Sequence, residues 1–156
     1  MEHLAEKVNK ANRIVGLRRR TFVSLEGESF KNLYVALVRS HLEYANQVWS
    51  PYLDKDKEIV EGVQRRATKL VPTLKKMNYE QRLKKLGIPT LAYRRKRGEM
   101  IEMFKILSGK YDEDLSRGLF TMHVDRRTRG HNKKVFKERT NLNKRKQSYC
   151  HRVVDD

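Results

Sequence analysis

The chain has 156 residues, 38% of them hydrophobic, and its 36 Lys and Arg against 19 Asp and Glu give a formal net charge of +17 at pH 7. This length supports one modest core, and the charge favours a polyanionic partner, either nucleic acid or an anionic membrane surface. A membrane-spanning helix needs about 18 consecutive apolar residues, and such a run is absent from the sequence, so we expect no membrane partner.

The first two predicted helices are defined by apolar residues at helical spacing. In the first, these residues step by four, three and four along one face, and three arginines follow at the C-terminal end, where cations suit the helix dipole. The residues are Leu4, Val8, Ala11 and Val15, then Arg18, Arg19 and Arg20. The second helix is expected to begin at Ser29, whose hydroxyl would cap it, and to run to Trp49 before Pro51 stops it. Its apolar residues are Phe30, Leu33, Tyr34, Leu37, Val38 and Leu42.

The third and fourth predicted helices have clear end signals. Asp54 is the expected N-cap of the third helix, and Pro72 closes it. Its apolar face consists of Ile59, Val63, Ala67 and Leu70. The fourth helix covers residues 79–86. Asn78 is its expected N-cap, and Gly87 is placed where a left-handed residue ends a helix.

A fifth helix is predicted from a Thr90 N-cap to Gly109, and the helical pattern then fades. Its stripe is Tyr93, Arg97, Met100, Phe104 and Leu107. Residues 117–152 hold 12 Lys and Arg but only two Asp and Glu, with few large apolar side chains, so they cannot bury much surface. Within them a short strand at 134–137 and a final helix at 144–153 are predicted.

These elements predict a mainly α protein. We expect an irregular bundle of about five helices, a thumb-like body over residues 1–116, followed by a basic, poorly ordered tail over residues 117–156. No repeat of 20 to 50 residues is apparent in the sequence.

The basic clusters are the candidate binding residues, because the planar guanidinium of arginine can hold a phosphate through two hydrogen bonds. They are Arg18, Arg19, Arg20, Arg65, Arg66, Lys69, Arg94, Arg95, Lys96, Arg97, Arg126, Arg127, Arg129, Lys133 and Lys134. The alternative is that each cluster is the solvated side of an amphipathic helix. Four clusters with few balancing acids favour phosphate binding. Base stacking is open to the aromatic residues, but their helical spacing favours the core. They are Tyr34, Tyr44, Trp49, Tyr52, Tyr79 and Phe104.

Catalytic and metal-binding patterns are not found in the sequence. The adjacent acids Asp155 and Asp156 end the chain, whereas the metal-binding turn of a polymerase needs a following strand. The spacing of the candidate metal ligands fits no familiar zinc site. These ligands are His123, His131, Cys150 and His151. No glycine-rich phosphate loop or serine nucleophile sequence occurs. We therefore expect no enzyme activity, no metal and no cofactor. A single cysteine and the lack of a secretory signal predict an intracellular protein.

One run, LVRSHLEYANQVWSPY at residues 37–52, goes beyond composition. It resembles the stretch just downstream of the catalytic palm in LINE-type, jockey-like non-LTR retrotransposon reverse transcriptases. Further similar pieces follow the order and spacing of that family, at residues 8–16, 61–69, 79–87, 91, 94–98, 104–109, 128–131 and 152–155. The resemblance covers nearly the whole chain.

The resemblance implies the thumb and downstream region of an RNA-directed DNA polymerase that copies element RNA at a nicked chromosomal target. Its helices would contact the backbone of the template-primer duplex, so the implied partner is RNA, DNA or their hybrid, the location is nuclear, and a palm domain is a possible contact. The palm, the fingers and the metal-binding carboxylates are missing. Because family members usually continue beyond Val-Val-Asp, the resemblance also implies a truncated copy. The alternative function is a structural or interaction module that packs on a palm domain or self-associates.

Overall fold

A computed structural model describes residues 2–21, 26–116, 118–122 and 133–154. The protein is mainly helical, which confirms the predicted fold class. Contacts divide it into two compact units, residues 1–95 and residues 96–156, with the boundary inside helix α7 (Leu91–Leu107). The division expected after residue 116 rests on charge and composition, and it stays a prediction.

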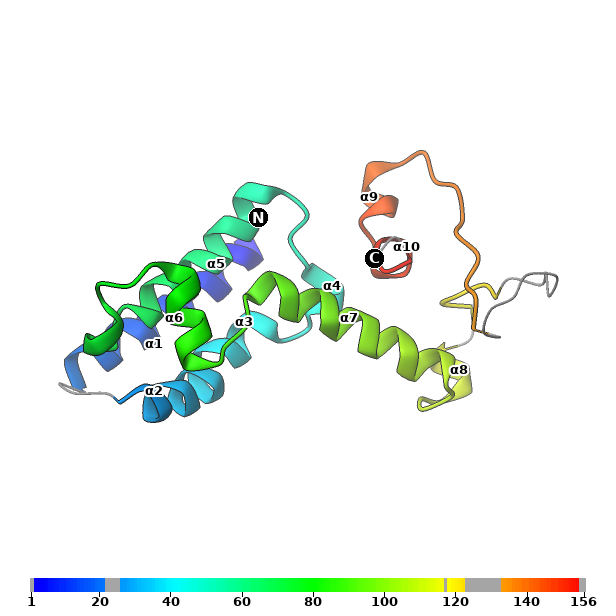
Figure 1. Cartoon of the computed structure of the whole chain (residues 1–156). Coiled ribbons are helices and arrows are strands. Elements are labelled where there is room, and N and C mark those ends of the chain that lie inside the picture. Colours follow the sequence, from blue (N-terminus) through cyan, green and yellow to red (C-terminus); the bar gives the residue numbers. More distant parts are fainter. Residues whose placement is uncertain (1, 22–25, 117, 123–132, 155–156) are drawn as a thin grey trace. The chain divides into compact units, whose positions relative to one another are not determined.

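The elements are labelled in Figure 1, and each unit is described by itself. Unit 1 contains α1 (Glu2–Thr21), α2 (Gly27–Leu33), the π-helical segment η1 (Tyr34–Arg39), α3 (Ser40–Glu43), α4 (Asn46–Trp49), α5 (Asp54–Thr68), the 3-10 helix η2 (Pro72–Leu74), α6 (Tyr79–Leu86) and the start of α7. Unit 2 contains the rest of α7, then α8 (Glu113–Ser116), α9 (Asn143–Lys146) and α10 (Tyr149–Arg152).

Unit 1 is built around one apolar core in which α1 packs on α5. The predicted stripe of α1 is confirmed, because Val8, Ala11 and Val15 are buried and Leu4 packs against them. On α5 the buried apolar side chains are Val60, Val63 and Ala67, whereas the predicted Ile59 is half exposed. This packing brings α1 and α5 side by side.

The predicted helix of residues 29–49 is interrupted. It begins at Gly27, with Glu26 as N-cap, so the expectation that Ser29 caps it was wrong. It then continues from α2 through the π-helical turn η1 into α3 and breaks at Ala45, a non-glycine residue with a positive φ of 53°. The buried side chains are four residues apart: Phe30, Tyr34, Val38 and Leu42. In a regular α-helix a four-residue repeat drifts by about 40° per step, and the wider π-helical turn reduces that drift and keeps the four side chains on the core.

The ends of α6 and α7 are formed by the predicted caps. Asn78 and Gln81 form a reciprocal capping box at the start of α6, and Gly87 ends the helix with a φ of 61°. The Thr90 hydroxyl accepts a hydrogen bond from the Tyr93 backbone N–H at 3.2 Å. The α5 prediction was off by one residue, since Asp54 lies inside the helix and Leu53 is its N-cap.

The stripe predicted for α7 as a core face was wrong. Tyr93, Met100 and Phe104 are exposed, and the buried positions are instead Leu91, Arg95 and Glu99. In Unit 2 the Glu99 carboxylate accepts hydrogen bonds from the Arg152 guanidinium at 2.9 and 3.1 Å, so an ion pair replaces apolar packing on this side of the helix. Periodicity shows which residues share a face but not whether that face is buried.

The C-terminal elements are shorter than predicted. In place of a strand at 134–137, the described residues show an isolated antiparallel bridge between Met122 and Val135. The single helix predicted over 144–153 is divided into α9 and α10. None of the helices in the described ranges combines the length and the hydropathy that a membrane span requires.

Candidate nucleic-acid interface

The predicted cations of α5 lie on the side of the helix that faces away from the core. Because α5 buries Val60, Val63 and Ala67, helical spacing places Arg65, Arg66 and Lys69 on its opposite side. All three are exposed.

Arg66 links α5 to α1. Its guanidinium Nη2 donates a hydrogen bond to Asn12 Oδ1 at 2.9 Å. Asn12 and the exposed Arg13 line a shallow hollow on α1 together with Asn9, Gly16 and Leu17. A guanidinium from α5 therefore reaches Asn12, which lines the same hollow on α1 as Arg13. We call the residues Asn9, Asn12, Arg13, Arg65, Arg66 and Lys69 the α1–α5 surface.

Arg65 has protein partners already. Its guanidinium forms two hydrogen bonds with the Glu58 carboxylate, at 2.7 and 3.3 Å, and lies 5.3 Å from the centre of the Tyr79 ring. The hydrogen bond to Glu58 raises the pKa of Arg65 above its usual value. Lys69 follows one turn later, at the C-cap of α5. Of the three α5 cations, Arg66 and Lys69 are therefore better placed to bind an external anion.

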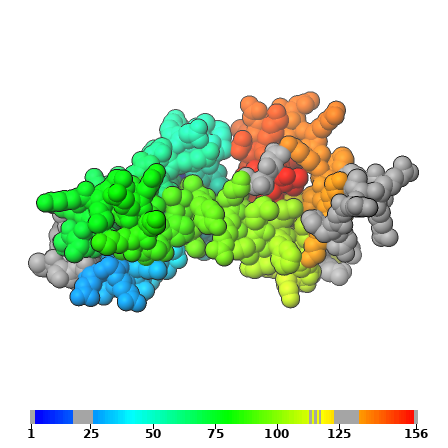
Figure 2. Space-filling model, viewed as in Figure 1, coloured from blue at the N-terminus to red at the C-terminus, as the bar shows by residue number. Residues whose placement is uncertain are grey.

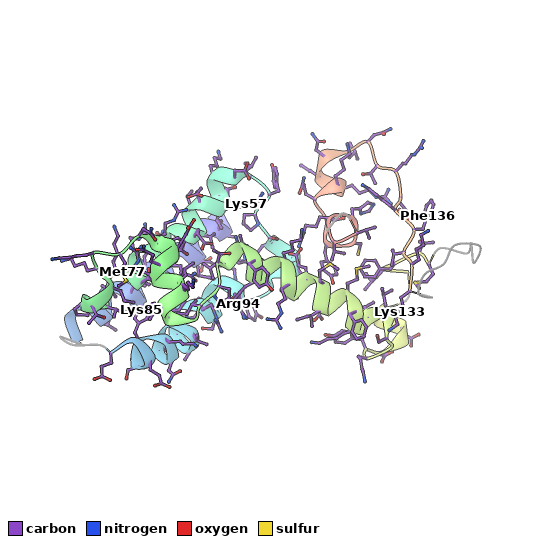
Figure 3. All side chains as sticks on the ribbon, viewed as in Figure 1. Lys57, Met77, Lys85, Arg94, Lys133 and Phe136 are labelled. Atoms are coloured by element: carbon purple, nitrogen blue, oxygen red, sulfur yellow. The ribbon has the colours of Figure 1, made fainter. Side chains whose placement is uncertain are left out.

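The arginines at the start of α7 are used in packing. Arg94, labelled in Figure 3, pairs with the Glu43 carboxylate of α3 through two hydrogen bonds of 2.5 and 3.1 Å. That hydrogen bonding raises the pKa of Arg94. Arg95 is buried, whereas Lys96 and Arg97 on the next turn are exposed. Charge alone does not distinguish the arginines that bind inside the protein from those that face solvent.

The other predicted clusters are described only in part. Arg18, Arg19 and Arg20 lie in the last turn of α1, and their side chains are outside the described residues, as are Arg126, Arg127 and Arg129. In Unit 2, Lys133 places its ammonium 4.3 Å from the centre of the Phe104 ring and donates a hydrogen bond to Ser108 Oγ. Lys134 is exposed.

A second basic group lies near the end of α6 and was not predicted. Lys84 and Lys85 lie in the last turn of α6, and the Lys31 ammonium of α2 lies 3.3 Å from where a Cβ would stand on Gly87. Figure 2 shows α2 and α6 next to each other on this face of Unit 1. Cations near the last carbonyls of a helix stabilise it. The sequence signal for this basic group was the pair of adjacent lysines just before the glycine that ends the helix.

A buried polar network holds α5, α6 and α7 together. The Tyr34 hydroxyl donates to Gln64 Oε1 at 2.6 Å, and Gln64 Nε2 donates to both the Tyr79 hydroxyl and the Pro89 carbonyl at 3.0 Å. Tyr79 in turn donates to the Glu61 carboxylate, which accepts the backbone N–H of Leu91 at 3.1 Å. Burial raises the pKa values of Tyr34 and Tyr79 well above their ordinary value. The network keeps α5 in one orientation, which fixes where Arg66 and Lys69 point.

Arg82 donates hydrogen bonds at the C-terminal end of α5 from inside the protein. Its buried guanidinium donates to Thr68 Oγ1 at 3.0 Å and to the Met77 carbonyl at 2.7 Å. It also lies 5.6 Å from the centre of the Tyr79 ring, which Arg65 contacts as well. Arg82 is therefore a structural residue and does not extend the α1–α5 surface.

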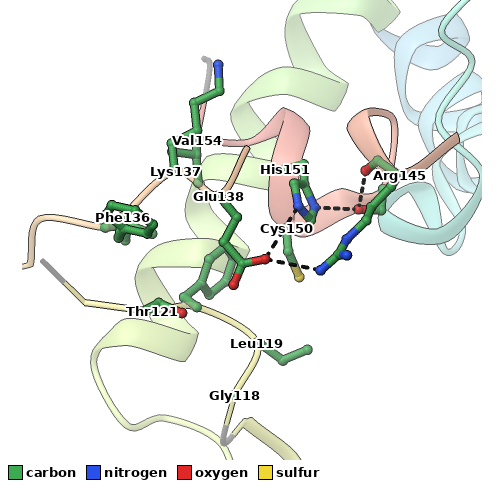
Figure 4. A pocket seen from close by; sticks show the side chains of 13 residues that line it. Gly118, Leu119, Thr121, Phe136, Lys137, Glu138, Arg145, Cys150, His151 and Val154 are labelled. Atoms are coloured by element: carbon green, nitrogen blue, oxygen red, sulfur yellow. Dashed lines mark hydrogen bonds and ion pairs between the residues drawn. The ribbon is translucent and has the colours of Figure 1, made fainter. Parts of the chain in front are cut away.

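A pocket in Unit 2, shown in Figure 4, brings together polar residues that were not predicted to form a site. The Ser148 hydroxyl donates to the Arg145 carbonyl at 2.8 Å and lies 2.9 Å from His151 Nδ1, and Glu138 pairs with Arg145 at 3.1 Å. The hydrogen bond from Ser148 to the Arg145 carbonyl joins the end of α9 to the start of α10. Burial raises the pKa of the nearby Cys150 thiol, which keeps it protonated.

Within the described ranges, no group of three or more His, Cys, Asp or Glu side chains is arranged to hold a metal ion. His123 and His131, considered above as ligands, lie outside those ranges. Comparisons of the chain with family models, with curated proteins and with solved structures give no match. The function of the α1–α5 surface therefore has to be inferred from its own geometry and charge, together with the resemblance of residues 37–52.

Proposed function

We propose that this chain is a nucleic-acid-binding fragment derived from a retrotransposon RNA-directed DNA polymerase, and that its α1–α5 surface contacts the backbone phosphates of RNA, DNA or an RNA–DNA hybrid. The observation that carries the proposal is the position of Arg66, which reaches from α5 to Asn12 at the hollow that Arg13 also lines. Lys69 extends the same side of α5 by one turn.

The charge of the protein supports this proposal. A net charge of +17 attracts a polyanion from a distance, and the α1–α5 surface offers cations from two rigid helices where it would bind. Arginine and asparagine side chains both donate hydrogen bonds to phosphate oxygens, and such contacts position a backbone without selecting a sequence. Binding is therefore expected to be strong at low salt and nearly independent of sequence.

The resemblance of residues 37–52 and of the later segments supports the retrotransposon origin, with a nuclear location as its consequence. In that family the equivalent region lies beyond the catalytic palm. We therefore assign phosphate contact to this chain and no polymerisation, and we expect no extended product when the protein is incubated with primer, template and Mg²⁺.

The test is the salt dependence of binding, measured by fluorescence anisotropy on a labelled RNA–DNA hybrid. On a duplex, each lost phosphate contact reduces the magnitude of the slope of log affinity against log salt concentration by about 0.9. The double variant Arg66→Gln/Lys69→Gln is expected to reduce that slope by about 2. The control is Lys55→Gln, which removes a positive charge from an exposed position near the other end of α5.

Two results would contradict the proposal. One is wild-type binding that is absent at low salt or insensitive to salt. The other is a slope that Lys55→Gln lowers as much as the double variant does, since the α1–α5 surface would then have no special role. Thermal unfolding of each variant shows whether the lost hydrogen bond to Asn12 has changed the fold.

An exposed apolar patch favours the second candidate function, an interaction module that self-associates or packs on a palm domain. Tyr44 is 74% exposed and Val48 is 85% exposed on either side of the break at Ala45. The Lys7 ammonium lies 5.0 Å from the Tyr44 ring centre, which leaves Val48 as the most open apolar side chain here. Sedimentation velocity of the wild type and of Val48→Asp tests this function, which predicts concentration-dependent association that the variant loses.

A further inference from the structure

The outward side of α7 in Unit 2 carries an exposed aromatic ring among cations. Phe104 is 59% exposed, and Arg97, Met100 and Ile101 lie on the same side of the helix, one or two turns earlier. The sequence pattern favoured a core position for this ring. The structure places it on the surface instead.

A lysine from a distant part of the chain sits over that ring. The Lys133 ammonium is 4.3 Å from the centre of the Phe104 ring and donates to Ser108 Oγ, which belongs to the turn after α7. Figure 3 shows Lys133 near the C-terminal end of α7. An ammonium held over a half-exposed ring combines the two features that bind single-stranded nucleic acid, a stacking surface and a phosphate-binding cation.

Two cations close to the ring favour an anionic partner. The cations on α7 and its neighbours are Lys96, Arg97, Lys105, Lys110, Lys133 and Lys134. Glu102 balances part of this charge, since it forms an ion pair with Lys105 at 3.4 Å and accepts a hydrogen bond from the Tyr111 hydroxyl. The acids Asp112, Glu113 and Asp114 follow α7 in the sequence. The cations at the ring itself are Lys133, which contacts it, and Arg97, which lies on the same side of α7.

We propose that Phe104 stacks on an unpaired base of single-stranded RNA or DNA and that Lys133 and Arg97 bind the phosphates on either side of that base. In the free protein the Lys133 ammonium covers the ring. When a base takes that position, the ammonium moves to the adjacent phosphate. This site is separate from the α1–α5 surface. It selects an unpaired strand over a duplex, whereas phosphate contacts at the α1–α5 surface do not make that selection, so the site goes beyond the proposed function.

The chemistry of the site selects against other partners. The faces of bases in a duplex are covered by their neighbours, so a stacking ring binds an unpaired base. A membrane would have to take up Phe104 together with the Lys133 ammonium and the Ser108 hydroxyl, and burying these groups in the acyl region is costly. Arg97 lies on the same side of α7 as the apolar residues. A purely apolar protein partner would have to bury its charge, which is costly for the same reason.

The test compares two truncations on one helix face. Phe104→Ala removes the ring, and Ile101→Ala removes an aliphatic side chain of similar exposure, 45%. Binding to a labelled single-stranded RNA of about 12 nucleotides, within the usual site size of such binders, is measured by anisotropy at two salt concentrations. Stacking contributes about 1–3 kcal/mol per base, or roughly 5- to 150-fold in affinity. Phe104→Ala is expected to weaken binding by that factor at an unchanged salt slope, and Phe104→Trp to retain it, while Ile101→Ala stays within about twofold.

Equal effects of Phe104→Ala and Ile101→Ala on RNA binding would overturn the proposal. It would also be overturned if Phe104→Ala left RNA binding intact but abolished co-sedimentation with phosphatidylserine-containing vesicles, which would assign this face to a membrane. The Arg66→Gln/Lys69→Gln variant, measured on the hybrid duplex, reports the α1–α5 surface separately. Failure of one site can therefore be told from failure of the other. The substituted side chains are exposed, and an unchanged thermal midpoint confirms that the fold is retained.

Discussion

Replacing Tyr34 by Phe removes one hydroxyl from the centre of Unit 1. The Tyr34 side chain is 1% exposed and Gln64 is fully buried, so the hydroxyl that donates to Gln64 Oε1 at 2.6 Å has no water to take its place. A buried acceptor that loses its donor costs about 1–3 kcal/mol. In a cooperative unit of about 95 residues, 2 kcal/mol corresponds to a fall in melting temperature of roughly 10 °C.

The assay is urea and thermal unfolding of the full chain followed by circular dichroism. Tyr44→Phe is the matched control because it deletes the same hydroxyl from an exposed ring, and we expect it to change the stability by less than about 0.5 kcal/mol. If Tyr34→Phe and Tyr44→Phe unfold at the same urea concentration, the buried network does not stabilise Unit 1 and the reasoning is refuted.

Two further predictions use the same unfolding assays. Gly87→Ala is expected to destabilise the protein by about 1 kcal/mol because Gly87 has a φ of 61°. Gly98→Ala, inside α7 with open space around it, is expected to stabilise the protein by roughly 0.5–1 kcal/mol. Equal effects of the two substitutions on stability would contradict this prediction. Burial raises the pKa of Tyr34 above its ordinary value of 10.0, so the stability gained from its protonated hydroxyl is complete below pH 10 and is lost as the pH rises further. The stability difference between wild type and Tyr34→Phe should therefore narrow above pH 10, and a constant or growing difference would argue against it.

Helix ends were the most predictable part of the fold. Asn78, Gly87 and Thr90 act through their own side chains or backbone on residues within three or four positions, so a short window of sequence contains all the necessary information. The N-cap of α5 was predicted at Asp54 and lies at Leu53, so this prediction was wrong by only one residue. The apolar face of α1 was equally clear because its opposite side is polar.

The failures in the fold have a different cause, since they depend on residues distant in the sequence. Phe104 belongs to a regular helical stripe, yet the buried side of α7 is set by Glu99, which pairs with Arg152 from 53 positions away. The break at Ala45 and the π-helical turn before it carry no glycine or proline signal. Tyr34 was correctly expected in the core, whereas Tyr44, Tyr52 and Phe104 are exposed.

The candidate site shows the limit of reasoning from charge. Arg66 and Lys69 lie on an open surface, as the clusters predict, but Arg94 is bound by Glu43, which is 51 residues away, and Arg95 is buried. A list of cations cannot show this difference, because the carboxylates that pair with them come from other helices. The Lys133 contact with Phe104 also joins distant segments, so it too required the structure.

The link between α6 and α7 is tied to α5 at two neighbouring backbone groups. Gln64 binds the carbonyl of Pro89, and Glu61, one turn earlier on α5, binds the backbone N–H of Leu91. The link therefore follows the surface of α5 and is not a hinge. One inserted residue would move the Pro89 carbonyl or the Leu91 N–H out of register with these two partners and would carry Arg94 away from Glu43. Related chains should thus vary in length elsewhere and keep this link constant.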